Sequence, residues 1–383
     1  MSDVAVSDVV ELLDQLVRAD STNPTLERDG AGEAEVARLL AERMQRAGLE
    51  VDVWDAAPGR PNVVGRLAGT GGGRTLMLCG HTDVVGGSPQ QFRPELRNGR
   101  MYGRGTNDMK GGIAAAQVAV ERLAQGPRPA GDVLLAWVID EEWASLGAES
   151  LVERYRADAA LLPEQSDLDV VFAHGGFVWY DVISVGKESA GGEPQHGVDG
   201  IALAGTFLSG IIALDRELET HTTPEWGRPN VHASTIRGGQ NYPSYPAECV
   251  IGVERCLMPG ESVAQADAEI EQLLASARAA DGRFRGRAET VIAREPVKLR
   301  RDDPIVLTVA GAARDHFGSD PVVRSDYGWM DSGVLVEAGI PCVVFGPTGA
   351  GVHTSEEWVD LRSLEDCVAV FEETVRRFCG AGT

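Results

Sequence analysis

The stretch Leu76-Met77-Leu78-Cys79-Gly80-His81-Thr82-Asp83 reads as a buried strand that ends in a histidine, with a carboxylate two residues further on. Apolar residues fill the run until Gly80 ends it. If the extended backbone continues past this glycine, the side chains of His81 and Asp83 point to the same side. A metal-ligating histidine oriented by an acid has this arrangement. Taken alone, however, a histidine at a strand end is more often a structural hydrogen-bonding residue.

The same pattern recurs along the chain, and this changes the interpretation. Four further segments place an acid or a histidine after an apolar run or a glycine-rich turn: 133–139 before Asp140-Glu141-Glu142, 159–162 before Glu164, 342–345 before His353, and the turn 103–112, which carries Asp108. In an open α/β sheet, sites form at the carboxyl ends of the strands. We therefore expect these groups to converge on a metal site rather than to be independent surface residues.

Size and charge limit the class of protein. The chain has 383 residues, which exceeds the usual single core of about 250–300 residues and favours two domains. No apolar run approaches the roughly 18 residues of a membrane span. There are 35 Lys and Arg against 58 Asp and Glu, a net charge of −23. This balance argues against nucleic acid and anionic membranes as partners.

The N-terminal residues and the cysteines indicate the compartment. Met1-Ser2-Asp3-Val4 is acidic and lacks the basic and apolar pattern of a signal peptide. The six cysteines show no CxxC pairing, and several lie in strand-like runs. They are typical of reduced core residues. The sequence therefore predicts a cytoplasmic protein.

The order of the elements predicts an interrupted α/β fold. Strands and helices alternate up to about residue 173, which is typical of a sheet covered by helices on both faces. Near Gly175-Gly176 the pattern changes to alternating apolar residues, and a compact βαββαβ arrangement follows. The α/β pattern resumes near residue 296. We expect a mixed-sheet catalytic domain formed by 1–176 and 295–383, interrupted by a smaller α+β, ferredoxin-like domain at 177–294.

The types of ligand limit the chemistry. Carboxylates with imidazoles suit Zn²⁺, Mn²⁺ or Co²⁺. Five ligands are too many for one tetrahedral catalytic zinc ion. They suit two metal ions about 3.5–4 Å apart that share a carboxylate and hold a hydroxide nucleophile. In the tandem Glu141-Glu142, one residue could bind metal and the other serve as general base. A solvated acidic loop explains Asp140-Glu141-Glu142 equally well when this segment is taken alone.

The chain resembles the family of dinuclear zinc amidohydrolases and exopeptidases that includes aminoacylase, acetylornithine deacetylase and succinyl-diaminopimelate desuccinylase. The motifs that carry the resemblance follow the family's order over nearly the whole chain: Ser21-Thr22-Asn23-Pro24, Gly80-His81-Thr82-Asp83, Gly105-Thr106-Asn107-Asp108-Met109-Lys110-Gly111-Gly112, Asp140-Glu141-Glu142, Pro163-Glu164 and His353-Thr354-Ser355-Glu356-Glu357. Each motif is modest alone, and together they are specific.

The resemblance implies a role for each site residue. Two Zn²⁺ ions are implied, with Co²⁺ or Mn²⁺ as alternatives. The implied assignments are His81 and Glu164 on one metal, Glu142 and His353 on the other, Asp108 bridging them, Asp83 orienting His81, and Glu141 as general base. The insert then corresponds to the family's lid and dimerisation domain, which implies a homodimer.

The insert also carries a turn that is similar to the family's substrate-facing turn. It includes Arg237, Gly238, Gly239 and Asn241, and His232 lies shortly before it. The resemblance implies that these residues contact a small N-acyl amino acid or peptide-like substrate. For His232, a polar residue on a solvated strand face is an equally good interpretation.

One departure from the family pattern affects the chemistry. By its glycine and proline anchors, Ala190 occupies the position of a lid histidine that stabilises the tetrahedral oxyanion, and Glu193 occupies that of an arginine. Loss of one oxyanion donor typically costs about 10²–10³ in turnover. His196 is a candidate substitute. Glu193 suggests a substrate that carries an amine or a guanidinium in place of a plain carboxylate.

Three hypotheses on function follow. The leading one is a metal-dependent hydrolase that cleaves the amide bond of an N-acyl amino acid or small dipeptide-like substrate. The alternative is a repurposed member that uses the same site for acyl or aminoacyl transfer, condensation or a non-amide reaction, because the lid histidine is Ala190. A non-enzymatic binding relative is the third. The complete ligand set and Glu141 argue against it, because a decayed site should have lost some of them.

Overall fold

The computed structural model describes residues 7–380, so the expectation drawn from Met1-Ser2-Asp3-Val4 lies outside the described residues. The chain forms two compact units. The first comprises the residues up to Phe172, then Leu299–Arg324 and the residues from Met330 onward. The second comprises Ala173–Lys298 and Ser325–Trp329.

The first unit is built on a mixed sheet, as the sequence predicts. The path of neighbouring strands is β1 (Glu50–Ala57), β2 (Arg60–Leu67), β6 (Val133–Val138), β3 (Leu76–His81), β7 (Ala159–Leu162), β17 (Cys342–Val344) and β8 (Val170–His174), with β16 (Val323–Asp326) paired to β8. The last two residues of β8, which already belong to the second unit, pair with β15 (Val297–Lys298) of that unit. Strands β6, β3, β7 and β17 run parallel. The flanking pairs are antiparallel. Four carboxyl ends therefore share one edge of the sheet.

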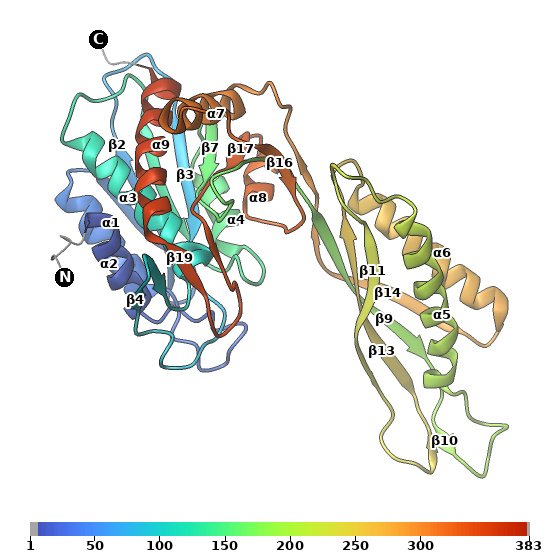
Figure 1. The fold of residues 1–383 in the computed structure, drawn as a ribbon. Helices are drawn as coiled ribbons and strands as arrows, with labels where there is room; N and C mark the ends of the chain where they lie inside the picture. Colours follow the sequence, from blue (N-terminus) through green and yellow to red (C-terminus); the bar gives the residue numbers. More distant parts are fainter. Residues whose placement is uncertain (1–6, 381–383) are drawn as a thin grey trace. The chain divides into compact units, whose positions relative to one another are not determined.

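Helices cover both faces of this sheet (Figure 1). They are α1 (Asp8–Arg18), α2 (Ala34–Arg46), α3 (Gly111–Ala124), α4 (Leu146–Arg154), α7 (Pro304–Phe317), α8 (Ser332–Glu337) and α9 (Leu361–Cys379). Helix α3 packs against α9 and α1, while α4 packs against α8. Strands β3, β6 and β7 are buried along their whole length, which explains their uninterrupted apolar runs.

The start of α3 lies unusually close to the end of β7. A Cβ atom on Gly112 would stand 1.7 Å from the main-chain oxygen of Pro163, a distance that no side chain can adopt. Glycine is therefore required at this position. The contact sets the turn that carries Asp108 beside the strand end that carries Glu164.

A second, small sheet was not predicted from the sequence. Its order is β18 (Gly349–Ala350), β19 (Trp358–Asp360), β5 (Arg100–Tyr102) and β4 (Glu95–Arg97). Strands β18 and β19 flank the loop that carries His353, and β5 precedes the π-helical turn η1 (Thr106–Lys110) that carries Asp108. The small sheet therefore joins two segments that are more than two hundred residues apart in the chain.

The second unit has the ferredoxin-like arrangement that the sequence predicts. Its antiparallel sheet has the order β11 (Asn230–Gly238), β13 (Glu248–Leu257), β9 (Gly176–Val185) and β14 (Arg285–Arg294). Helices α5 (Gly200–Glu219) and α6 (Val263–Ala280) pack on it and on each other. Asp199 and Ser262 cap the two helices by accepting hydrogen bonds from main-chain amides. A short pair, β10 (Ser189–Ala190) with β12 (Ser244–Tyr245), completes the unit.

Two further expectations concern helices and cysteines. Within residues 7–380, no helix combines the length and the apolar character needed to cross a membrane. All six cysteines are free thiols, and all except the half-buried Cys256 are buried. Their predicted role as reduced core residues is consistent with this placement.

Candidate metal centre

The shared edge of the parallel strands gathers most of the predicted ligands. His81 is the last residue of β3, Glu141 and Glu142 lie shortly after β6, and Glu164 follows β7. Asp108 reaches this edge from η1. His353 belongs to the loop between β18 and β19. All five predicted metal ligands fall into two groups of potential donors, and within each group the ligand atoms lie within 4.8 Å of one another.

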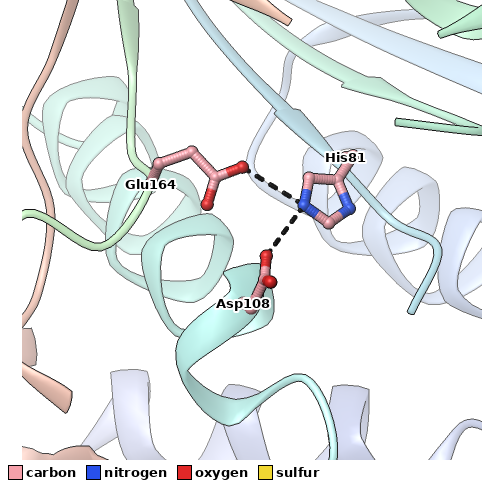
Figure 2. Close-up of side chains that lie close together, drawn as sticks. All are labelled: His81, Asp108 and Glu164. Carbon is pink, nitrogen blue, oxygen red and sulfur yellow. Dashed lines mark hydrogen bonds and ion pairs between the residues drawn. The ribbon is translucent and has the colours of Figure 1, made fainter. Parts of the chain in front are cut away.

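The first donor group consists of His81, Asp108 and Glu164 (Figure 2). The Nε2 atom of His81 lies 3.1 Å from Oδ1 of Asp108 and 3.2 Å from Oε1 of Glu164. All three residues are buried. One nitrogen and two oxygens therefore face a common point away from bulk water.

The second donor group consists of Asp108, Glu142 and His353. The Nε2 atom of His353 lies 3.2 Å from Oδ2 of Asp108 and 3.0 Å from Oε2 of Glu142. The two oxygens of Asp108 thus face different histidines, as a bridging carboxylate requires. The side chain of His353 is 52% exposed, so this group is open to solvent on one side.

Glu141 stands beside the donor groups without belonging to either. Its Oε2 atom is 3.9 Å from Nε2 of His81. Burial raises the pKa of this carboxyl well above its usual value, and the neighbouring Asp331, Glu164 and Glu142 raise it further, against the opposing effect of His81. A carboxylate with a raised pKa is suited to accept and return a proton near neutral pH.

The electrostatics of the site fit divalent cations. Burial and the nearby Asp108 and Glu142 raise the pKa of Glu164 to about 7, although His81 opposes the change. Burial also disfavours the ionised form of Asp108, but hydrogen bonds with His353 and His81 outweigh it and lower the pKa. Several carboxylates thus share two imidazoles. Buried charges of one sign require compensation, and oxygen and nitrogen donors in this arrangement suit two metal ions.

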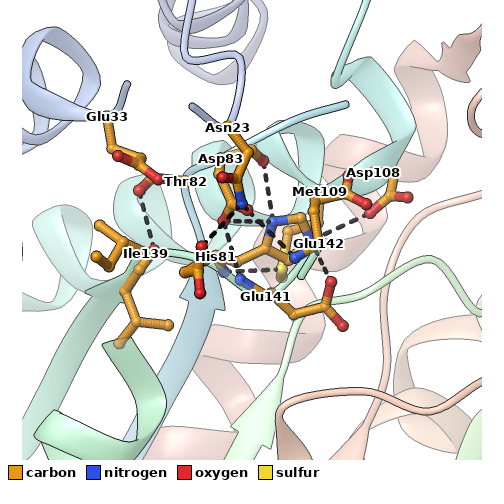
Figure 3. A network of polar contacts seen from close by, with 12 residues as sticks. Asn23, Glu33, His81, Thr82, Asp83, Asp108, Met109, Ile139, Glu141 and Glu142 are labelled. Carbon is orange, nitrogen blue, oxygen red and sulfur yellow. Dashed lines mark hydrogen bonds and ion pairs between the residues drawn. The ribbon is translucent and has the colours of Figure 1, made fainter. Parts of the chain in front are cut away.

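Asp83 contacts both donor groups through different atoms (Figure 3). The Nδ1 atom of His81 lies 3.0 Å from the main-chain oxygen of Asp83 and 3.5 Å from its carboxylate. The carboxylate itself accepts hydrogen bonds from the side-chain amide of Asn23, at 2.8 Å, and from the main-chain amides of Glu141 and Glu142, both at 3.2 Å. Asp83 therefore holds the histidine with its backbone and the Glu141-Glu142 segment with its side chain.

A buried polar network behind Asp83 was not predicted from the sequence. Asn23 also donates to Asp140 Oδ1 at 3.0 Å. The guanidinium of Arg60 donates to the same oxygen at 2.9 Å and pairs with Glu33. The signals in the sequence were the motifs that contain Asn23 and Asp140. Arg60 and Glu33 belong to no recognised pattern.

Glu357 is a further residue that the sequence analysis left without a role, although it lies in the motif of His353. Its carboxylate accepts hydrogen bonds from Arg104 and from three main-chain amides in the turn that ends at Asp108. The residue is 1% exposed.

The predicted substrate-binding residues lie in the second unit. Arg237, Gly238 and Gly239 line a hollow of about 660 Å³, together with Glu188, Ser189, Gln240, Ser244, Tyr245, Pro246, Ala247, Glu248 and Val250. His232 and Asn241 are not among the lining residues. His232 is paired with Glu254, its Nε2 atom lying 3.4 Å from a carboxylate oxygen, and Asn241 is exposed.

The segment that departs from the family pattern is exposed. Ala190 pairs with Ser244 in the short β10–β12 ladder. Glu193 and His196 follow in a turn, where the main-chain amide of His196 donates to the carbonyl of Glu193 at 3.1 Å. The side chain of His196 is exposed.

Comparison with known proteins agrees with this geometry. The profile described as Peptidase family M20/M25/M40 matches residues 77–377, a span that contains both donor groups. Similar curated proteins include an N-formyl-4-amino-5-aminomethyl-2-methylpyrimidine deformylase of Bacillus subtilis, 26% identical over 89% of this chain and 88% of the relative. An acetylornithine deacetylase of Myxococcus xanthus is 30% identical over 88% and 90%. A succinyl-diaminopimelate desuccinylase of Alkalilimnicola ehrlichii is 27% identical over 98% and 100%.

Solved structures share the fold. An aminopeptidase of Bacillus cereus superposes with a TM-score of 0.79 at 22% identity and covers 96% of this chain and 98% of its own. A metallo-carboxypeptidase of Sulfolobus solfataricus gives the same score at 17% identity, with coverage of 97% and 99%. The family match covers most of the chain, the fold agrees with it, and Asp108 belongs to both donor groups. The chain therefore belongs to peptidase family M20/M25/M40 and is a metal-dependent hydrolase.

Proposed function

We propose that this protein hydrolyses the amide bond of an N-acyl amino acid or a small dipeptide-like substrate at a two-metal centre. The observation that supports this most strongly is Asp108, whose two oxygens face two separate histidines. The relatives named as deformylase, deacetylase and desuccinylase all remove a small acyl group from nitrogen, which supports the same class of reaction.

In this proposal each donor group holds one metal ion, with zinc as the proposed metal. His81 and Glu164 would hold one ion, Glu142 and His353 would hold the other, and Asp108 would contribute to both. When bound, such ions polarise the carbonyl that is attacked and lower the pKa of a water molecule.

Glu141 is the proposed general base. Its carboxylate lies beside the first donor group, and its side chain is only 13% exposed. It would take the proton from the attacking water and deliver it to the leaving nitrogen, which needs a proton to depart as an amine. Asp83 assists by fixing the backbone of Glu141 through the 3.2 Å hydrogen bond to its amide.

The insert at 177–294 is proposed to act as lid and dimerisation domain in a homodimer. Arg237, Gly238 and Gly239 are the proposed substrate contacts, because they line the hollow in this unit. Glu188 and Glu248 line the same hollow, and their charge supports a substrate that carries an amine or a guanidinium. A preference for anionic acyl amino acids would contradict this assignment.

The alternative of a repurposed transferase or condensing enzyme gains no support from the comparisons. The relatives described above are named for hydrolytic removal of acyl groups or as peptidases. Alanine at position 190 is therefore expected to affect the rate of hydrolysis and not the class of reaction.

The test is product analysis by mass spectrometry with the zinc-loaded protein. The panel contains N-acetyl, N-formyl and N-succinyl amino acids, each with neutral, cationic and anionic side chains, and simple dipeptides. Glu141→Gln is the blank, and general-base loss should lower turnover by about 10²–10⁴ while both metals stay bound. Absence of wild-type turnover on every member of the panel, with two zinc ions bound, would refute the proposal.

Ala190→His provides a second arm of the same experiment. If the missing lid histidine limits oxyanion stabilisation, this substitution should raise kcat by up to about 10²–10³ without changing the preferred acyl group. His196→Ala in the wild-type background reports whether His196 acts as the substitute. An unchanged rate in that variant would exclude the role.

A further inference from the structure

The carboxylate of Glu357 is surrounded by donors from the turn that leads into Asp108. Oε2 accepts from Nη1 of Arg104 at 2.7 Å and from the amide of Gly105 at 2.9 Å. Oε1 accepts from the amides of Asn107 and Asp108 at 3.0 and 3.1 Å. The last of these bonds holds the main-chain amide of Asp108, the residue that belongs to both donor groups.

The backbone of Glu357 adds a further bond to the same turn. The amide of Gly103 donates to the carbonyl of Glu357 at 3.1 Å. Glu357 lies four residues after His353 and directly before β19, which pairs with β5. The loop that carries His353 is therefore joined to the turn that carries Asp108 on both the side-chain and the main-chain level.

Arg104 closes this connection from the other side. Its guanidinium donates to Glu357 and, through Nη2, to the carbonyl oxygens of Gly86 and Thr354 at 3.2 and 3.1 Å. Thr354 directly follows His353. The side chains of Arg104 and Glu357 are 4% and 1% exposed, so water does not compete for these bonds. Charge-assisted hydrogen bonds of this kind are stronger than neutral ones.

We propose that Glu357 is a positioning residue that couples the two metal subsites, by holding the backbone of Asp108 in register with the loop of His353. The inference rests on the proposed two-metal centre. Glu357 belongs to neither donor group, so it acts only through the ligands that it holds. Asp108 serves both subsites but His353 only one, so loss of Glu357 should weaken the subsite of Glu142 and His353 more than that of His81 and Glu164.

The test is titration of the metal-free protein with Co²⁺ alone, followed by visible absorption and calorimetry. Wild type should bind two equivalents. Glu357→Gln keeps the shape of the side chain but replaces one acceptor oxygen by an NH₂ group. Two of the four groups that donate to the carboxylate would then face another donor and lose their hydrogen bonds. Loss of such an outer partner of metal ligands typically costs 10–100-fold in metal affinity. We expect the two equivalents to be weakened unequally, one by a factor of this size and the other by less.

Two matched variants define the control and the second line of the test. Glu356→Gln changes the neighbouring acid, whose side chain is 80% exposed, and should bind both equivalents as wild type does. Arg104→Lys keeps the charge but loses the second guanidinium nitrogen that reaches Gly86 and Thr354. It should shift the same equivalent in the same direction by a smaller factor. This variant carries the test if Glu357→Gln does not fold.

The outcomes separate a positioning role from a structural one. Unchanged Co²⁺ binding by Glu357→Gln would overturn the inference and leave the two-metal centre intact. Equal weakening of both equivalents, with a lower Tm of the metal-free protein, would assign Glu357 a structural role only and also overturn it. A wild type that binds fewer than two equivalents would refute the proposed centre itself, and the inference with it.

Discussion

Replacement of Arg60 by methionine should destabilise the first unit strongly. The guanidinium lies 3.0 Å from Oε2 of Glu33 through Nε, and Nη1 lies 2.9 Å from Oδ1 of Asp140 and 3.1 Å from Oγ1 of Thr25. The side chain of Arg60 is 10% exposed and those of its two acidic partners are 0% exposed. Removal of the cation leaves two carboxylates buried, and breaking such a pair typically costs about 3–5 kcal/mol.

The assay is urea unfolding of the metal-free protein. With a urea m-value of about 3 kcal/mol/M, the expected loss lowers the midpoint by about 1 M or more. Arg66→Met is the matched control. Arg66 also pairs with two acids, Glu50 and Asp132, but its side chain is 43% exposed. Solvent-exposed pairs contribute at most about 1 kcal/mol, so the control should shift the midpoint only slightly.

The pH dependence gives an independent check on the cause. Burial raises the pKa of Glu33, and Arg60 is the group that opposes this rise. Without Arg60 the folded-state pKa should lie further above the unfolded value, so the folded state takes up a proton first as the pH falls. The deficit of Arg60→Met should therefore shrink between pH 7 and pH 5. An equal midpoint shift in both arginine variants, or a deficit that grows on acidification, would refute the reasoning.

Two more predictions concern stability and the strand ends. Burial lowers the pKa of His174 to about 4, below the unfolded value of about 6.5. The unfolded state therefore binds more protons at this residue, and the contribution of His174 to stability should fall by about 2 kcal/mol from pH 7.5 to pH 5. In urea unfolding at both pH values His174→Asn should flatten this slope, and an unchanged slope would contradict the assignment. Gly112→Ala forces a Cβ against the Pro163 carbonyl and should lower the stability by about 1–3 kcal/mol. It should also lower the metal content, measured by mass spectrometry. Gly126→Ala is the control and should leave both quantities near wild type, because its Cβ would meet no atom nearer than 3.9 Å.

The sequence predicted the elements whose signal is local. Strand β7 (Ala159–Leu162) has the predicted limits, and β3 (Leu76–His81) ends at the predicted histidine. Their signal is an uninterrupted apolar run. The convergence of ligands at strand ends was also predictable, because the carboxyl ends of parallel strands meet at one edge.

Other features depend on partners far away in the chain and have no local signal. The strands of the small sheet, such as β18 (Gly349–Ala350) and β4 (Glu95–Arg97), are two or three residues long and exist only because their neighbours align them. Arg60 and Asp140 form a hydrogen bond although they lie 80 residues apart in the sequence, and Glu357 and Asp108 do so although they lie 249 residues apart. A single sequence carries no periodicity or spacing that relates such residues.

The insertion point of the second unit has a consequence for how this enzyme can diversify. The chain leaves the central sheet on β8 and returns on β15, and these strands are hydrogen-bonded neighbours, with His174 opposite Val297 and Ala173 opposite Lys298. To the rest of the sheet, the whole insert occupies the place of a hairpin loop. Changes in its length or surface can therefore leave the register of the central strands unchanged.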